Sequence, residues 1–198
     1  MNKGLLFVVS GPSGTGKGTI CKVIQNDDNI FLSVSTTSRE IRPGEVDGET
    51  YNYTSKENFE KMIAEGEMLE WAEYDGNYYG TPKETVKKML SEGKNIILEI
   101  EVQGALKVQQ IFPETKMIFV VPPSMSELKK RLVERGREDE ERINARLLRA
   151  KEELLLSDRY DYIVVNDVLE RCIDDVRAII KKAESEKTLV NNLLKEEY

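Results

Sequence analysis

The chain of 198 residues contains no histidine. This absence excludes a histidine general base, a serine–histidine or cysteine–histidine nucleophile pair, and any metal site built on imidazole. Phosphoryl transfer to a phosphate acceptor is compatible with it. A phosphate monoester is largely ionised near pH 7, because its second pKa is about 6, so the reaction requires positioning and charge neutralisation rather than deprotonation.

Cysteines and long apolar runs are also scarce. Cys21 and Cys172 are the only cysteines, too few for a disulfide framework or a zinc site, which indicates a reducing, cytoplasmic environment. The apolar run Leu5–Val9 is too short for a signal-peptide core or a membrane span, so we expect no membrane association. A net charge of −7 argues against nucleic acid as a partner.

A glycine-rich segment follows this apolar run directly. Its spacing is G-x-x-x-x-G-K, between a buried strand and a helical pattern over residues 17–25. Such a segment is typical of a loop whose N–H groups converge on the phosphates of a nucleoside triphosphate, whereas a plain strand-to-helix turn is the alternative. We expect Lys17 to reach the β- and γ-phosphates of a nucleoside triphosphate. The predicted nucleotide-binding residues of the loop are Gly11, Pro12, Ser13, Gly14, Thr15, Gly16, Lys17, Gly18 and Thr19.

The loop departs from its commonest form at residue 18. Gly18 stands where many such loops carry a Ser or Thr that ligates Mg²⁺, and Thr19 comes one residue later. We therefore predict no direct protein ligand for this cofactor. Mg²⁺ keeps several of its waters, so phosphates and water would hold it, with Thr19 and Glu99 as the nearest side chains.

Short apolar runs alternate with helical patterns along the chain. Expected strands cover residues 5–10, 31–35, 95–101, 116–121 and 160–165, and expected helices cover 17–25, 104–111, 126–134 and 169–183. This alternation predicts an α/β fold with a parallel sheet covered by helices on both faces. The tail 184–198 has apolar residues at helical spacing that could pack on the body or on a second subunit, so monomer and homodimer both stay open.

Two segments interrupt this alternation. Residues 36–84 contain a helical pattern and the turn Asp75-Gly76-Asn77, which predict a small insert with a hairpin. Near its start, Arg39 and Arg42 suit a phosphate dianion, the alternative being two solvated surface arginines. The second segment, residues 129–151, is rich in Lys and Arg, a composition that also fits an ordinary solvated helix face.

Several ordered motifs together resemble the guanylate kinase family over residues 4–183. They are the loop 11–19 and the segments 33–39, 42–45, 70–72, 76–81, 98–104 and 121–124. The resemblance implies a P-loop nucleoside monophosphate kinase fold in one domain. Its parts would be a core (1–35, 85–128 and 152–198), a mixed α/β GMP-binding insert (36–84) and a mobile lid (129–151).

The resemblance also implies an activity and its residues. The γ-phosphoryl group of ATP would pass to GMP, giving ADP and GDP in purine nucleotide metabolism and GMP recycling, with dGMP open as a second acceptor. Four residues match positions on the GMP phosphate, namely Arg39, Arg42, Tyr51 and Tyr79, with Glu45 orienting the arginines. Four others match positions around guanine, namely Ser35, Glu70, Thr81 and Glu101. Asn166 matches a position near the adenine of ATP. The implied catalytic set is Lys17, Arg39 and the lid arginines Arg131, Arg135 and Arg146.

Hydrogen-bond chemistry supports the assignment of the base site. Guanine offers N1–H and N2–H₂ to a carboxylate and O6 to a hydroxyl, which Glu70 and Thr81 would supply, whereas adenine lacks both donors. The family usually has Asp where this chain has Glu101, which moves that carboxylate by about one bond length. A kinase for another nucleoside monophosphate and a non-catalytic binding module are the two alternatives. The intact Lys17 and glycine loop argue against the second.

Overall fold

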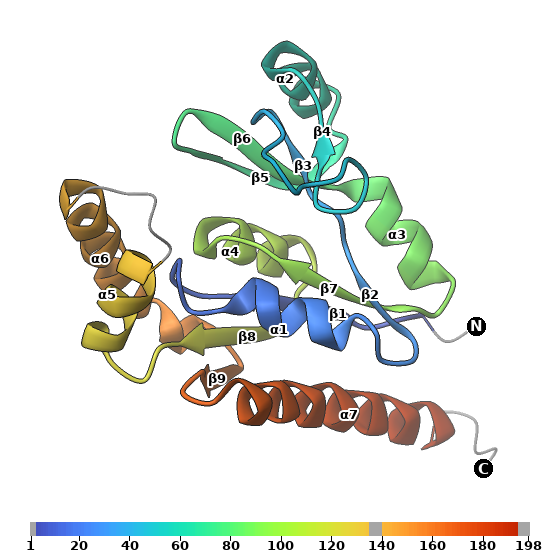
Figure 1. Cartoon of the computed structure of the whole chain (residues 1–198). Coiled ribbons are helices and arrows are strands. Elements are labelled where there is room, and N and C mark those ends of the chain that lie inside the picture. Colours follow the sequence, from blue (N-terminus) through green and yellow to red (C-terminus); the bar gives the residue numbers. More distant parts are fainter. Residues whose placement is uncertain (1–2, 135–139, 194–198) are drawn as a thin grey trace. The chain divides into compact units, whose positions relative to one another are not determined.

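The computed structural model describes residues 3–134 and 140–193, which fall into two compact units. The first unit comprises Met1–Val8 with Asp28–Thr115, and the second comprises Val9–Asp27 with Lys116–Tyr198. Five parallel strands form the main sheet in the order β2-β7-β1-β8-β9 (Figure 1). The strands are β1 (Leu6–Ser10), β2 (Ile30–Leu32), β7 (Asn95–Glu99), β8 (Lys116–Val121) and β9 (Tyr162–Val165). The predicted α/β class with a parallel sheet is confirmed.

In the first unit, β2 and β7 pair in parallel, with Phe31 opposite Ile96. Helix α3 (Lys83–Ser91) packs against β7 and buries Val86 and Leu90, which lie four residues apart and therefore on one face. The sequence analysis did not predict this helix. Helix α4 (Val102–Ile111) begins directly after Glu101, so the expected strand over 95–101 is two residues too long.

A second sheet of this unit contains four strands in the order β4-β3-β6-β5. They are β3 (Thr36–Thr37), β4 (Asn52–Tyr53), β5 (Met68–Tyr74) and β6 (Asn77–Pro82). Strands β5 and β6 form the predicted hairpin, in which Asp75 and Gly76 both have positive φ, at 50° and 75°. Helix α2 (Lys56–Ala64) begins after Ser55, whose hydroxyl accepts a hydrogen bond from the N–H of Asn58 at 3.1 Å.

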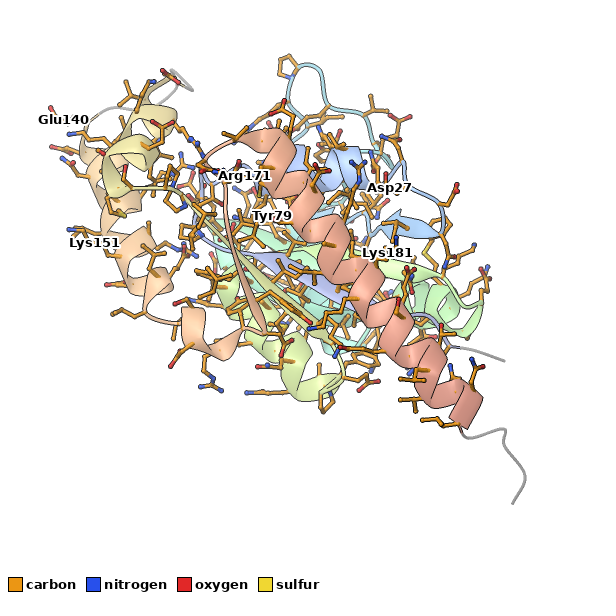
Figure 2. The ribbon with its side chains drawn as sticks, turned by 90° about the horizontal axis from the view of Figure 1, so that it is seen from below. Asp27, Tyr79, Glu140, Lys151, Arg171 and Lys181 are labelled. Atoms are coloured by element: carbon orange, nitrogen blue, oxygen red, sulfur yellow. The ribbon has the colours of Figure 1, made fainter. Side chains whose placement is uncertain are left out.

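In the second unit, β8 and β9 pair in parallel, and β8 lies in the core. Its residues Met117, Ile118, Phe119 and Val120 are fully buried. Helix α1 (Lys17–Ile24) packs against α7 (Leu169–Leu193). Arg177 of α7 donates two hydrogen bonds of 2.7 Å to Asp27, which follows α1 and is labelled in Figure 2. Helix α7 extends ten residues beyond its expected end, so the described part of the tail, residues 184–193, is helical.

The segment 129–151 lies mostly in two helices of the second unit. They are α5 (Met125–Glu134) and α6 (Glu140–Leu154), which pack through Leu128, Leu132, Ile143 and Ala150. The hydroxyl of Ser124 accepts from the N–H of Glu127 and begins α5. Arg135 lies outside the described residues. None of the helices within residues 3–134 and 140–193 combines the length and the apolar character that crossing a bilayer requires.

Candidate nucleotide sites

The loop between β1 and α1 depends on glycine for its shape. Gly11, Gly14 and Gly16 have φ values of 134°, 89° and 92°, which side chains with a Cβ rarely adopt. A Cβ on Gly11 would lie 2.2 Å from the carbonyl oxygen of Val120. The three glycines therefore allow the chain to turn back over the N-terminus of α1, where free N–H groups attract anions.

Lys17 is the first residue of α1, and its side chain folds back over this loop. Its ammonium Nζ donates to the carbonyl oxygens of Gly11 at 2.5 Å and Pro12 at 3.1 Å. An ammonium group has three donors, and a phosphate oxygen is a stronger acceptor than a neutral carbonyl. The loop therefore carries a buried positive charge that a phosphate could draw away from the backbone.

Asn166 follows β9 and braces the loop. Its Nδ2 donates to the carbonyl oxygen of Thr15 at 2.7 Å, and its backbone N–H donates to the carbonyl oxygen of Val121 at 2.9 Å. A Cβ on Gly16 would lie only 2.4 Å from this Nδ2. The hydroxyl of Thr15 donates in turn to the carbonyl oxygen of Pro12 at 2.9 Å. The loop is thus fixed from the end of the neighbouring strand.

Two of the predicted arginines reach this loop region from α5 and α6. Arg131 donates through Nε to Glu127 at 3.0 Å and through Nη2 to the carbonyl oxygen of Asn166 at 2.9 Å. Arg146 donates to the hydroxyl of Ser13. Both guanidinium groups thus lie beside residues that shape or form the glycine loop.

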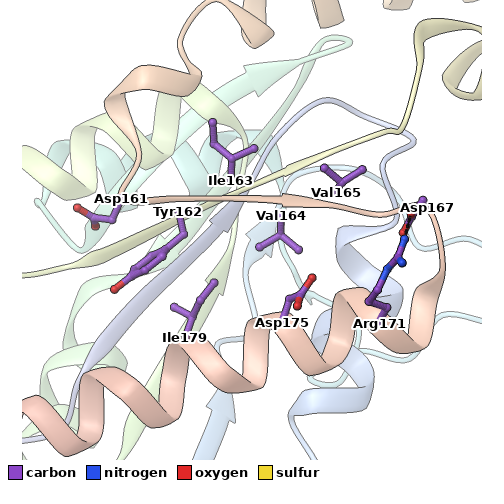
Figure 3. A pocket seen from close by; sticks show the side chains of 9 residues that line it. All are labelled: Asp161, Tyr162, Ile163, Val164, Val165, Asp167, Arg171, Asp175 and Ile179. Carbon is purple, nitrogen blue, oxygen red and sulfur yellow. Dashed lines mark hydrogen bonds and ion pairs between the residues drawn. The ribbon is translucent and has the colours of Figure 1, made fainter.

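A cavity of about 410 Å³ opens beside the loop, within the usual size range of ligand sites. It is lined by Gly14, Gly16, Thr19, Arg131, Glu134, Asn166, Asp167 and Leu169. A larger hollow of about 570 Å³ lies between β9 and α7, shown in Figure 3. That hollow has no glycine loop, and its Arg171 is paired with Asp167. We therefore take the cavity beside the loop as the candidate site for a nucleoside triphosphate.

In the first unit, the predicted phosphate-binding residues gather around the carboxylate of Glu45. Its Oε1 accepts from Nη2 of Arg39 at 2.8 Å, and its Oε2 accepts from the N–H of Arg42 at 2.8 Å. The hydroxyl of Tyr53 also donates to Oε2 at 2.8 Å. The hydrogen bond from Arg39 is the main cause that lowers the pKa of Glu45 to about 2 and raises the pKa of Arg39 itself. Glu45 and Arg39 are therefore both charged near pH 7, and Glu45 holds Arg39 in place as an ion pair.

Tyrosine rings surround the Arg39 guanidinium. Its carbon lies 5.6 Å from the ring centre of Tyr51 and 5.9 Å from that of Tyr53, within the range of a cation–π interaction. The rings of Tyr51 and Tyr79 meet edge to face at 5.9 Å. Burial, together with the nearby charge of Glu99, raises the pKa of Tyr51 to about 12. The phenol therefore stays protonated near pH 7 and can donate a hydrogen bond to an anion.

The predicted base-reading residues form a buried pair on the β5–β6 hairpin. Glu70 and Thr81 lie opposite each other in register, and the hydroxyl of Thr81 donates to Oε1 of Glu70 at 2.7 Å. Burial raises the pKa of Glu70 to about 7, with the charge of Glu101 adding to the rise, while the hydrogen bond of Thr81 and the charge of Lys107 oppose it. Glu70 is 5% exposed. A carboxyl group with so little exposure to solvent requires a polar partner to be stable in the folded protein.

The remaining predicted residues of the first unit lie near strand ends. Ser35 precedes β3, and its carbonyl oxygen accepts from the N–H of Asn52 at 2.8 Å. Glu99 ends β7, and Glu101 stands at the N-terminus of α4; both are half-buried. The side chain of Arg42 is exposed. Across the part of the chain that the structure describes, no cluster of three carboxylates or thiols is arranged to hold a metal ion.

Sequence reasoning missed three residues of these sites. Tyr53 contacts Glu45 and Arg39, and its two-residue spacing from Tyr51 on an extended segment is a signal that could have found it. Gly104 and Lys107 of α4 contact Glu70 and Trp71. They lie more than 30 positions along the chain from Glu70 and Trp71, and no local pattern indicates that contact.

Comparisons with known proteins identify the chain's relatives. A family model described as guanylate kinase matches residues 3–183. The guanylate kinase of Halalkalibacterium halodurans is 55% identical over 179 residues, which cover 90% of this chain and 88% of that protein. The guanylate kinase of Caldanaerobacter subterraneus is 52% identical, covering 90% and 87%. A crystal structure of guanylate kinase from Anaplasma phagocytophilum superposes with a TM-score of 0.76 at 32% identity, covering 92% of this chain and 87% of that one. The resemblance drawn from the motifs is therefore confirmed.

Proposed function

The chain belongs to the guanylate kinase family, and from that premise we propose how its residues transfer the γ-phosphoryl group of ATP to GMP. The chemistry requires little of the protein except positioning and charge neutralisation, because GMP already carries an ionised phosphate near pH 7. The absence of histidine is compatible with this requirement.

The donor nucleotide would bind at the glycine loop of the second unit. The loop N–H groups and Lys17 hold the β- and γ-phosphates of ATP, while the cavity beside the loop takes the rest of the nucleotide. Arg131 and Arg146 neutralise charge on the transferred group, as arginine residues do in related phosphoryl transfers. Arg135 is assigned the same role from its place in the sequence.

The acceptor GMP would bind to the first unit. Arg39, Arg42, Tyr51 and Tyr79 hold its phosphate, with Glu45 fixing Arg39. Glu70 accepts hydrogen bonds from guanine N1–H and N2–H₂, and Thr81 presents its hydroxyl beside it. Ser35 and Glu101 complete the base site, and dGMP is a further candidate acceptor. The buried Glu70–Thr81 pair is the observation that carries the guanine assignment, because an unmatched buried carboxyl group rejects adenine.

The residues of the loop fit a magnesium ion held mainly by phosphate and water. Gly18 offers no side-chain ligand, and the hydroxyl of Thr19 is the one loop oxygen of this kind that lines the cavity. Mg²⁺ accepts such sparse protein ligation because it dehydrates reluctantly. When bound with ATP, the ion would neutralise phosphate charge. Glu99, at the end of β7, is assigned to the outer coordination sphere of Mg²⁺.

The metabolic role of the enzyme follows from its substrates. A kinase of this type acts in purine nucleotide metabolism and in the recycling of GMP, and we assign it to the cytoplasm. Cys21 and Cys172 are both buried and neither forms a disulfide, as a reducing compartment favours. The protein would work as one domain, with residues 36–84 as the GMP-binding insert and 129–151 as the lid, in a monomer or a homodimer.

The base assignment is tested with Glu70→Gln, assayed with GMP and with AMP as acceptor. A glutamine keeps the size of the side chain but replaces one acceptor oxygen by an NH₂ donor, so we expect kcat/KM for GMP to fall by about 10²-fold and the preference over AMP to shrink. Glu73→Gln serves as the matched control, since Glu73 is an exposed residue of the same strand. Unchanged selectivity in Glu70→Gln would remove the proposed role of Glu70.

A further inference from the structure

Helix α4 approaches Oε2 of Glu70, whereas Thr81 contacts Oε1, and the contacts of α4 with β5 have no role in the function proposed above. We propose that Lys107 of α4 is a positioning residue for guanine recognition, which anchors β5 beside Glu70 and keeps the Glu70 carboxylate an acceptor. This inference rests on the proposed function, since it concerns how the same base site selects its ligand.

The first observation is the contact between Lys107 and Trp71, the residue after Glu70. The Nζ atom of Lys107 donates to the carbonyl oxygen of Trp71 at 2.8 Å and lies 5.0 Å from the centre of its indole ring. One ammonium group therefore contacts both the backbone and the side chain of residue 71. Helix α4 also packs along β5. The hydrogen bond from Lys107 thus holds the backbone next to Glu70 against helix α4.

The second observation is the close approach of Gly104 to the Glu70 carboxylate. A Cβ on Gly104 would lie 2.2 Å from Oε2 of Glu70. Oε1 of the same carboxylate accepts the hydrogen bond from Thr81 on β6. The carboxylate is therefore confined between α4 and β6, and its position depends on how α4 is attached to β5.

The third observation is the balance of charge around Glu70. Lys107 of α4 supplies the positive charge that acts on it, Glu101 before α4 supplies a negative one, and Thr81 of β6 is neutral. Loss of the Lys107 charge would leave burial and Glu101 to favour the protonated carboxyl group. A protonated Glu70 would turn an O–H toward the N1–H of guanine, so that two donors face each other.

The test compares Lys107→Met, which removes the charge, with Lys107→Arg, which keeps both charge and donors. Lys88→Met is the matched control, because Lys88 is an exposed lysine of α3 and its loss changes the net charge equally. GMP affinity is measured from pH 6.0 to 8.5 by calorimetry and by the fluorescence of Trp71, the only tryptophan. Steady-state kinetics at the same pH values give kcat and the KM values for GMP and ATP.

In Lys107→Met, we expect GMP affinity at pH 7.0 to fall about fivefold, because the midpoint of its pH dependence rises by about one pH unit. Affinity should return to within about twofold of the wild type at pH 8.5, while kcat and the KM for ATP stay unchanged. Lys107→Arg and Lys88→Met should match the wild type. The phosphate of GMP titrates equally in every variant, so the difference between curves isolates Glu70.

The inference would be overturned if GMP affinity of Lys107→Met depended on pH as it does in the wild type. It would also be overturned by a loss of affinity that is equal at all pH values, since that result indicates a structural contact only. A misfolded variant would not recover at pH 8.5, so folding failure cannot imitate the expected result. The proposed function itself fails by a different outcome, namely a wild-type protein that does not bind or phosphorylate GMP.

Discussion

The side chain of Asn166 donates a hydrogen bond to the carbonyl oxygen of Thr15 at 2.7 Å, across 151 positions of sequence. The contact joins the end of β9 to the glycine loop, and a Cβ on Gly16 would collide with the same amide nitrogen. The loop is therefore shaped by its glycines and by a neighbouring strand end together. Because the contact between Asn166 and Thr15 lies at the ATP site, that site can be tested by ATP binding alone, without GMP.

Gly16→Ala should disable the donor site. The new Cβ would lie 2.4 Å from Nδ2 of Asn166, and the φ of 92° would be strained as well. We expect a stability loss of about 1–3 kcal/mol and the loss of thermal stabilisation by ATP with Mg²⁺. Gly66→Ala is the control, since Gly66 has a φ of 70° with nothing within 4 Å of a Cβ. Equal effects of the two changes on ATP binding would show that crowding against Asn166 is irrelevant.

Arg131→Met should reduce turnover more than binding of GMP. The change removes a guanidinium that donates to the carbonyl oxygen of Asn166 and lines the cavity beside the loop. Arginines that stabilise phosphoryl transfer contribute about 10³-fold or more to kcat. We expect kcat to fall by at least 10²-fold, measured by coupled ADP release. Lys130→Met, on the neighbouring residue, should leave kcat within about twofold.

Glu45→Gln should weaken the binding of GMP and leave the binding of ATP unchanged. Glutamine cannot replace the charged partner of Arg39, and its NH₂ donor would face either the Arg39 guanidinium or both the Tyr53 hydroxyl and the N–H of Arg42. We expect the KM for GMP to rise by about tenfold, corresponding to 1–2 kcal/mol. Glu40→Gln is the control, because its carboxylate is exposed and Arg39 contacts only the backbone carbonyl oxygen of Glu40, which the change retains. An increase in the KM for ATP would contradict the assignment.

The buried Glu70 predicts a pH dependence of stability in the absence of nucleotide. Its pKa is about 7 in the folded protein, above about 4.3 in an unfolded chain. Below pH 4 both states hold the proton; as pH rises toward 7 the unfolded state loses it first, and the free energy of unfolding falls. Relative to Glu70→Gln, the wild type should lose about 3 kcal/mol between pH 4 and 7. Urea titrations of both proteins measure this difference, which a flat result would contradict.

The fold was largely predictable because its signals are local. The glycine loop and the Asp75-Gly76 turn each require backbone angles that few residues adopt, so a short pattern identifies them. Helix α3 was missed because it begins after Pro82 with no side-chain cap and buries only Val86 and Leu90. The strand expected to reach Glu101 was too long because Ile100 extends the apolar run without marking where α4 begins.

The sites were predictable only in part. Glu70 and Thr81 belong to adjacent strands of a hairpin, so motif and register point to the same pair. The contacts of Lys107 and Asn166 join segments distant in sequence, and their partners are backbone carbonyl oxygens, which every residue possesses. The sequence therefore gives no indication of which residue accepts such a hydrogen bond, and only the folded structure identifies it.

The most direct test is the release of ADP from ATP and Mg²⁺ with GMP, AMP, CMP or UMP as the acceptor. We expect rapid turnover with GMP and at most a trace with the other three, because the Glu70–Thr81 pair matches guanine alone. Comparable turnover with AMP or a pyrimidine nucleotide would contradict the guanine assignment, and no turnover with any acceptor would contradict the proposed catalysis.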